Sequence, residues 1–312
     1  MSLSKKIELD GLSANVYKGE TENNHGIKIG FYGTSCLTFS YNGSTYLNDP
    51  FFSNPSYYEI LTGKYKDHSS VINPYLNKMD SISLVTITHG HYDHCLDFPY
   101  FMKKYTDNAK IISSNSTLLS LTAYTDNKKS WNEYPIENNK NKWIYSADKV
   151  FRVFPVRSNH QAHIGKIKLL TGENINPFSK APGPVWQWKE GITYSYIVDV
   201  MNQDEIVDRF LIIAGDLPEE SIHIINELQK EKRIKIMFSP FWHKQKSGAA
   251  FQYSYNLVKP EQVIFHHWNN FFNNTDQEIE CIRSSDIVRQ VAEKKLEGYP
   301  VSIMIPFTEV SL

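Results

Sequence analysis

One short segment restricts the fold and chemistry of this chain more than any other: residues 85–94 read Val-Thr-Ile-Thr-His-Gly-His-Tyr-Asp-His. This H-x-H-x-D-H motif directly follows an apolar strand pattern. Neutral imidazole nitrogen and carboxylate oxygen are the ligands that zinc and similar divalent metals prefer. Because side chains two apart point the same way in an extended chain, His89 and His91 can converge on one ion. If the backbone turns after His91, Asp93 and His94 can face a second ion nearby.

The composition narrows the class of partner. The chain has 312 residues and a net charge of -1, from 33 basic and 34 acidic residues. A nucleic-acid footprint normally needs a clustered excess of Lys and Arg, so we expect a small-molecule substrate and no nucleic acid. No linker rich in Pro, Gly or Ser and no repeat divides the sequence. We therefore expect one domain over residues 1–312.

The cysteines and the apolar segments indicate a compartment. Cys36, Cys95 and Cys281 are odd in number and far apart, which argues against a disulfide framework and fits a reducing compartment. Cys95 adjoins the motif, but we expect a small buried thiol there and not a ligand. No stretch approaches the roughly 20 apolar residues of a membrane span, and the N-terminal residues include no apolar signal region. We expect a cytoplasmic protein without a transmembrane segment.

The hydrophobic pattern predicts a fold built mainly of strands. Alternating apolar residues over 27–31 and 37–41, then an Asn42-Gly43 turn into 45–47, predict an antiparallel meander that ends at Asp49. Residues 83–88 predict a buried strand, and a helix is expected after the motif. That helix covers 96–105, with further helices at 219–232 and 285–296 and strands at 110–113, 150–156, 193–200, 210–214, 234–238, 263–266 and 301–306.

The order of these elements predicts the fold class. Strands predominate in both halves, and helices are interleaved less regularly than in a βαβ array. We expect an α+β fold, an αββα sandwich in which two mixed sheets pack face to face with helices outside. The polar residues 125–142 are expected to form an exposed insertion. Residues 174–189, which include Trp186 and Trp188, predict a long ordered loop over a pocket.

Further potential ligands follow later strands, as a two-metal site requires. Asp216 comes after five apolar residues and a glycine, where a carboxylate could bridge two cations. Its alternative is the N-cap of the helix that begins near Pro218. His243 follows the strand at 234–238, and either lines the pocket or lies in an exposed loop. The other candidates at strand ends are His160 and His163, and His266 and His267.

The order of these residues resembles the metallo-β-lactamase-fold superfamily of metal-dependent hydrolases. Its members carry H-x-H-x-D-H, then a lone His, a Gly-Asp or similar acid, and a final His; the match spans about 27–306. The resemblance implies the two-sheet sandwich and two divalent metal ions, with zinc expected first and manganese or iron as alternatives. The implied ligands are His89, His91 and His160 for the first metal and Asp93, His94 and His267 for the second, with Asp216 bridging both.

Two neighbouring pairs of histidines leave a choice. His160 is favoured over His163 because it lies nearer the strand end. His267 is favoured over His266 because the following Trp-Asn-Asn-Phe resembles the His-Trp-x-x-Phe of one branch of the superfamily. The unused histidine of each pair binds substrate or packs. Asp49 matches an early strand-end acid that orients the ligand histidines by hydrogen bonding.

That branch includes the ascorbate-6-phosphate lactonases and the N-acyl-phosphatidylethanolamine phospholipases D. It often carries Gly-His in the first hairpin, where this chain reads Gly33-Thr34-Ser35. The resemblance implies hydrolysis of an ester, lactone or phosphodiester by a metal-bridging hydroxide, with Asp93 and Asp216 as the catalytic acids that orient the water and accept its proton. Two alternatives stay open: an iron-dependent oxidoreductase similar to persulfide dioxygenases, and a non-catalytic metal-binding protein on the same fold.

Overall fold

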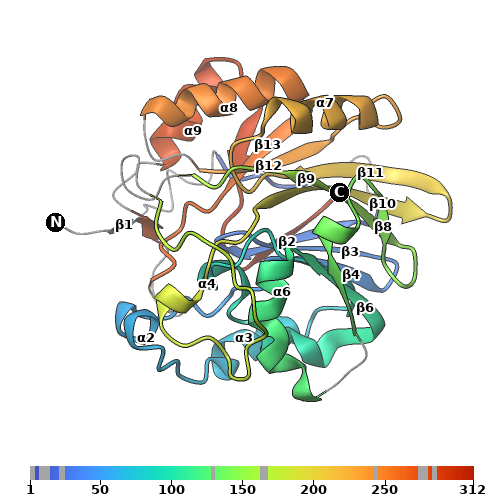
Figure 1. Ribbon diagram of the computed structural model, residues 1–312. Coiled ribbons are helices and arrows are strands. Elements are labelled where there is room, and N and C mark those ends of the chain that lie inside the picture. Colours follow the sequence, from blue (N-terminus) through green and yellow to red (C-terminus); the bar gives the residue numbers. More distant parts are fainter. Residues whose placement is uncertain are drawn as a thin grey trace.

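Two seven-stranded mixed sheets pack face to face, and helices cover the outer face of each (Figure 1). The expected αββα sandwich is confirmed in this computed structural model. Within the part of the chain that the structure describes, no helix is long and apolar enough to cross a membrane. The described residues are 4–6, 15–20, 25–127, 131–161, 168–241, 245–272, 280–282 and 287–312.

The first sheet has the order β16-β2-β3-β4-β5-β6-β7. The predicted meander is confirmed, because β2, β3 and β4 pair antiparallel. From β4 onward the pairing is parallel through β5, β6 and β7, so these strands end at the same edge of the sheet. The strands are β2 (Lys28–Gly33), β3 (Cys36–Tyr41), β4 (Ser44–Asn48), β5 (Ser81–Thr86), β6 (Tyr105–Ser113), β7 (Trp131–Pro135) and β16 (Thr308–Ser311).

The second sheet has the order β15-β13-β12-β11-β10-β9-β8. Its strands are antiparallel from β8 to β11 and parallel from β11 to β15. A separate two-stranded sheet pairs β1 (Ser4–Lys6) with β14 (Glu280–Ile282). The strands of the second sheet are β8 (Ile144–Tyr145), β9 (Phe151–Arg157), β10 (Tyr194–Asn202), β11 (Glu205–Ile212), β12 (Ile236–Pro240), β13 (Gln262–His266) and β15 (Val301–Ile303).

The helices form the two outer layers. α7, α8 and α9 lie over the second sheet, and α2, α3 and α6 lie on the side of the first (Figure 1). The helices are α2 (Tyr57–Thr62), α3 (Ser69–Leu76), α4 (Tyr92–Cys95), α5 (Phe98–Phe101), α6 (Asn115–Leu121), α7 (Glu219–Leu228), α8 (Gln245–Val258) and α9 (Ile287–Leu296), with 3-10 turns η1 (Met102–Lys104), η2 (Thr122–Asn127), η3 (Ile136–Asn138) and η4 (Val185–Gln187).

Two sequence expectations about these elements were wrong. In place of the single helix expected over 96–105, the structure has the short helix α5 and the 3-10 turn η1 after α4 ends at Cys95, and Tyr105 already begins β6. The residues 125–142 do not form a mere insertion, because β7 is the edge strand of the first sheet and Ile136 is buried. The polar composition of β7 misled the prediction, since an edge strand needs fewer apolar side chains than a central one.

The core fills both faces of the first sheet. Between the sheets, Phe39 packs on Phe210 with ring centroids 4.9 Å apart. Beneath the helices, Phe52 packs on Phe101 at 5.9 Å. All five residues of β4 are buried. The polar residues that end these strands are therefore held in a rigid setting, which is what a metal site requires.

A capping box fixes the start of α2. The Ser56 hydroxyl accepts from the Glu59 N–H, and the Ser56 N–H donates to Glu59 Oε2 at 3.0 Å. Glu59 Oε1 accepts from the Lys66 N–H at 2.9 Å and lies 3.1 Å from His68 Nε2. Burial works to raise the pKa of Glu59, but the hydrogen bonds and His68 outweigh it and lower the pKa to about 2.

We expect Glu59→Gln to lower the free energy of unfolding at pH 7 and to have less effect in acid. Because the pKa of Glu59 is depressed in the folded state, its stabilisation is present above the ordinary value of 4.5 and is lost as the pH falls toward about 2. Urea unfolding at pH 7 and at pH 3 measures this, with the exposed Glu220→Gln as control. An equal loss of stability at both pH values would contradict the prediction.

Candidate metal centre

The backbone of the motif changes from extended to helical after His91. β5 ends at Thr86, the backbone is still extended at His91, and α4 begins at Tyr92. His89, His91, Asp93 and His94 are all buried. The helical turn carries Asp93 and His94 to one side while His89 and His91 stay on the extended part. One short segment thus presents two separate pairs of potential ligands.

The first group of ligand atoms combines His89 and His91 with His160. One atom from each residue lies within 4.8 Å of the other two. His89 Nε2 is 3.0 Å from His91 Nδ1, and the ring of His160 lies 4.6 Å and 4.8 Å from those of His89 and His91. His160 comes from the loop after β9 in the second sheet, so both sheets contribute to the group.

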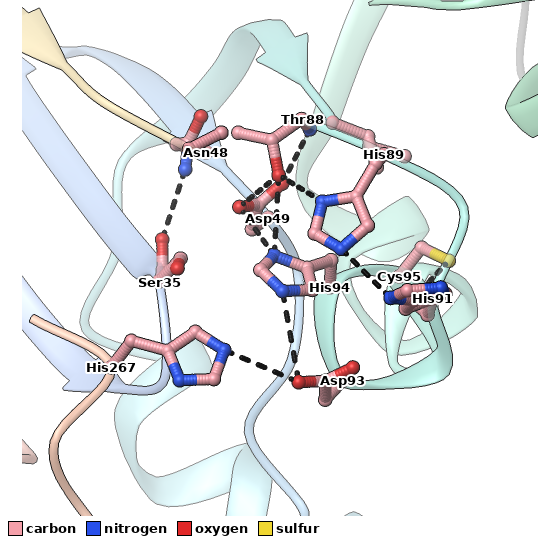
Figure 2. A network of polar contacts seen from close by, with 12 residues as sticks. Ser35, Asn48, Asp49, Thr88, His89, His91, Asp93, His94, Cys95 and His267 are labelled. Atoms are coloured by element: carbon pink, nitrogen blue, oxygen red, sulfur yellow. Dashed lines mark hydrogen bonds and ion pairs between the residues drawn. The ribbon is translucent and has the colours of Figure 1, made fainter. Parts of the chain in front are cut away.

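The second group combines Asp93 and His94 with His267. Asp93 Oδ2 lies 3.6 Å from His94 Nε2 and 3.4 Å from His267 Nε2 (Figure 2). One potential ligand atom from each of these three residues lies within 4.8 Å of the other two. His267 follows β13 of the second sheet. The rings of His89 and His94 are 4.0 Å apart, so the two groups adjoin.

Asp49 is hydrogen-bonded to Thr88 and His94 of the motif segment. It lies just after β4, is fully buried, and takes a left-handed backbone with φ 47°. Its Oδ1 accepts from the Thr88 N–H at 2.7 Å, and its Oδ2 accepts from the Thr88 hydroxyl at 2.8 Å. Oδ2 also lies 2.8 Å from His94 Nδ1 (Figure 2). A carboxylate can only accept, so His94 Nδ1 donates and Nε2 keeps its lone pair for a metal.

Thr88 orients His89, a histidine of the first group, by a hydrogen bond of the same kind. Its hydroxyl hydrogen is donated to Asp49, so its oxygen accepts from His89 Nδ1 at 3.1 Å. His89 then carries its lone pair on Nε2, the atom that faces His91. Asp49 therefore directs one imidazole by contact and a second through Thr88. The role expected for Asp49, to orient the ligand histidines, stays a prediction that these contacts support.

The hairpin between β2 and β3 holds the loop that carries His267. The Thr34 carbonyl accepts from the His267 N–H at 2.6 Å, and the Thr34 N–H donates to Asn269 Oδ1 at 2.7 Å. Thr34 and His267 both have left-handed backbones, with φ 46° and 58°. Asn48 Nδ2 donates to the Ser35 carbonyl at 2.9 Å and so ties the hairpin to β4. The roles of Asn48 and Thr34 were not predicted from the sequence, although Gly33-Thr34-Ser35 departs from the Gly-His of the branch that the chain resembles.

His266 is not placed as a ligand. It is buried, its Nδ1 lies 3.1 Å from Ser35 Oγ, and its Nε2 lies 3.1 Å from the Ile213 carbonyl. Burial and then His267 lower its pKa to about 3, so it is neutral and packs between elements. The preference for His267 over His266 agrees with this arrangement. His163 and His243 lie outside the described residues.

Asp216 lies beside Asn159, the residue that precedes His160. It is exposed, and its backbone exchanges two hydrogen bonds with Asn159, of 2.8 Å and 2.9 Å, beside His160. A Cβ at Gly215 would lie 2.3 Å from the Asn159 carbonyl, so this pairing requires glycine. The N-cap of α7 is Pro218, so the capping alternative for Asp216 was wrong. Neither group of ligand atoms includes Asp216, and its bridging role stays a prediction.

The charges of the two groups suit a divalent cation. Burial, and then the surrounding imidazoles, hold the pKa of His89 well below its usual range, so this ligand is neutral. Burial works to raise the pKa of Asp93, but His94 and His267 outweigh it and keep the carboxylate ionised. Burial works to lower the pKa of His94, but Asp49 and Asp93 outweigh it, so the pKa is raised. Five imidazoles and one carboxylate are a donor set that zinc, iron and manganese accept.

The thiol beside the motif is structural. Cys95 Sγ donates to the His91 carbonyl at 3.2 Å, and burial raises the pKa of the thiol well above its usual range. Cys36 and Cys95 are both buried and free. The expectation that Cys95 is no ligand agrees with these contacts.

The long loop after β9 packs against the motif. The Gly90 N–H donates to the Glu190 carbonyl at 2.9 Å, and a Cβ at Gly90 would lie 2.2 Å from the Lys189 carbonyl. Trp188 is fully buried beneath this crossing. A hollow of about 660 Å³ borders the loop between Asn174 and Lys189. The sequence had predicted an ordered loop here, and one side of the motif is covered by it.

Solved structures of other proteins share this fold. Igni18, a metallo hydrolase from the archaeon Ignicoccus hospitalis, has a TM-score of 0.57 and 18% identity, covering 92% of this chain and 98% of its own. An isothiocyanate hydrolase from Delia radicum gut bacteria has a TM-score of 0.52 and 12% identity, covering 91% and 99%. CmlA, a diiron β-hydroxylase from Streptomyces venezuelae, has a TM-score of 0.52 and 11% identity, covering 94% and 55%.

These likenesses identify the fold and nothing finer. No family model matches the sequence, and no curated protein is significantly similar to it. At identities of 18% or less, the shared feature is the arrangement of the two sheets and their helices. The sandwich of two mixed sheets with helices outside, expected from the sequence, is confirmed and is the fold that these structures share.

We expect Asp49→Asn to weaken zinc binding by about 10- to 100-fold, most strongly at the Asp93–His94–His267 group, because loss of the carboxylate frees the ring and tautomer of His94. Competition titration against a chromophoric chelator measures both affinities. Asp97→Asn is the matched control, since this buried acid accepts from the Phe52 and Ser53 N–H groups and contacts no candidate ligand through them. Equal weakening by both variants would contradict a specific role of Asp49.

Proposed function

We propose that this protein is a dinuclear metal-dependent hydrolase of esters, lactones or phosphodiesters. The observation that carries the proposal is the adjacency of two complete ligand triads, His89–His91–His160 and Asp93–His94–His267. The first metal would be bound by the first triad and the second metal by the other, with zinc as the preferred ion. Asp216, whose side chain is exposed, would be the ligand shared by the two metals.

The residues of the site have distinct parts in this chemistry. Two divalent cations, when bound, would lower the pKa of a shared water from about 15.7 toward 7 and polarise the oxygen under attack. Asp93, held ionised by His94 and His267, would orient the attacking water and accept its proton. Asp216 would share this task. Asp49 and Thr88 would keep the imidazoles in the tautomers that the reaction needs.

Proteins that share this fold include hydrolases, which supports the proposal of hydrolysis. Igni18 is a metallo hydrolase, and the protein from Delia radicum gut bacteria hydrolyses isothiocyanates. The resemblance of the His267-Trp-Asn-Asn-Phe segment to the lactonase and phospholipase branch adds esters, lactones and phosphodiesters as substrate classes to test. A panel of nitrophenyl esters, bis(nitrophenyl) phosphate and simple lactones covers these classes.

We expect His91→Ala and Asp93→Ala each to remove about one equivalent of bound metal, and to slow hydrolysis by at least about 100-fold. The several kcal/mol of charge stabilisation that a metal supplies corresponds to this loss. Elemental analysis and a rate assay on the responsive substrate measure the two effects in the same preparation. His223→Ala, an exposed histidine of α7, is the control. Normal turnover by a metal-poor His91→Ala/Asp93→Ala double variant would falsify the proposal.

A second candidate is oxidation chemistry at iron. CmlA, which shares the fold, is a diiron hydroxylase, although this chain spans only 55% of its length. The described donor set also suits iron. Oxygen consumption by the iron-loaded protein, assayed with persulfides, separates this reaction from hydrolysis by the zinc-loaded protein. Iron purified with the protein together with oxygen uptake would favour the oxidoreductase.

A further inference from the structure

We propose that the site takes an amphiphilic substrate whose acyl or alkyl chain lies along a row of three rings, Tyr57, Phe272 and Phe271. This inference rests on the proposed function and adds the substrate class. The hydrolysable head group would lie at the two triads, and the chain would extend from His267 toward α2. Tyr57, Phe272 and Phe271 form this aromatic row.

The aromatic row runs from a candidate ligand to the surface. The ring of Phe271 meets that of His267 edge-on, with centroids 5.1 Å apart. Phe272 follows at 4.5 Å from Phe271, and Tyr57 stacks on Phe272 at 4.3 Å with an interplanar angle of 13°. The row therefore connects the second triad with the first turn of α2 through continuous ring contacts.

The outer part of the row is open to a ligand. Tyr57 is 42% exposed, Phe272 is half-buried, and the His267 side chain is 24% exposed. Phe271 is nearly buried and backs the row at the His267 end. A stacked aromatic pair at the surface exposes flat apolar area that water solvates poorly. Contiguous apolar area of this kind, next to polar ligands, is typical of a binding surface.

The apolar surface continues beyond the row. Leu61 is 56% exposed and lies one helical turn after Tyr57 on the same face of α2. Trp186 is 55% exposed in η4, which packs against α2. The Tyr65 hydroxyl fixes this contact by donating to the Gly183 carbonyl at 3.0 Å. An unbranched substrate chain longer than the three rings would contact these further apolar side chains. The surface therefore favours a substrate with a long chain over one with a compact apolar group.

The Tyr57 side chain takes no part in the capping bonds that fix the two ends of α2. The helix start is fixed by Ser56 and Glu59, whose capping bonds involve no atom of the Tyr57 side chain. The helix end is fixed by Gly63, whose left-handed backbone has φ 68°. A smaller residue at position 57 would leave these contacts intact. Tyr57 can therefore be changed to test ligand binding without removing the helix.

Isothermal titration of the zinc-loaded full chain with unbranched carboxylates from acetate to octanoate tests the inference. A carboxylate supplies the anionic head that hydrolysis products share, and each added methylene reports burial of the chain. Full burial of a methylene contributes about 0.8 kcal/mol, or about 4-fold in affinity, so we expect a gain of about 2- to 4-fold per methylene. We expect Tyr57→Ala and Phe272→Ala to reduce this gain, while acetate affinity changes by less than about 2-fold.

Matched variants locate the effect. Tyr57→Phe and Phe272→Leu keep apolar side chains and should preserve most of the gain per methylene, which also guards against loss of folding. Tyr58→Ala is the control, because Tyr58 is the next residue of α2 and is 66% exposed. Tyr58→Ala should leave the gain unchanged.

The outcomes separate this inference from the proposed function. Zinc and acetate binding without any gain per methylene would overturn the amphiphilic substrate and leave the hydrolase proposal standing. A gain that survives Tyr57→Ala and Phe272→Ala would overturn the aromatic row as its location. Failure of the full chain to bind zinc at all would instead remove the proposed function on which the inference rests.

Discussion

The parallel pairing of β4 with β5 is the constraint on which the site depends. The register sets Asn48 opposite Thr86, and the Asp49 N–H then donates to the Thr86 carbonyl at 2.9 Å. With its left-handed backbone, Asp49 turns its carboxylate toward Thr88 and His94. A shift by one residue would send these side chains to the opposite face of the sheet. The buried strands on both sides make such a shift costly.

Two neighbouring residues at the end of β4 thus serve opposite sides of the second triad. Asp49 sets the ring of His94, and Asn48 donates to the Ser35 carbonyl of the β2–β3 hairpin (Figure 2). The Thr34 carbonyl of the same hairpin accepts from the His267 N–H. These hydrogen bonds with protein groups orient the potential ligand atoms of the second triad. Preorganisation of this kind lowers the entropic cost of binding and fixes which lone pairs face the ion. The aromatic row begins at the same His267, so the ordering of this loop would serve metal and substrate together.

Much of the fold could be predicted from the sequence because its strands have strong periodicity. The meander before Asp49 and the buried strand before the motif were confirmed, and helix α7 began at the expected Glu219. The errors fell on segments without a clear pattern. β7 is polar because it is an edge strand, and α8 escaped prediction because its residues show little separation of polar and apolar faces.

The sequence by itself determined the kinds of potential ligand and their order along the chain, because the motif and the later strand-end histidines have the chemistry and spacing typical of a metal site. Only the tertiary structure decided which of them meet. The choice of His267 over His266 depends on a left-handed turn held by the distant Thr34, and the row from Phe271 to Tyr57 joins residues more than 200 positions apart. Such contacts follow from sheet packing and loop closure, which no local pattern encodes.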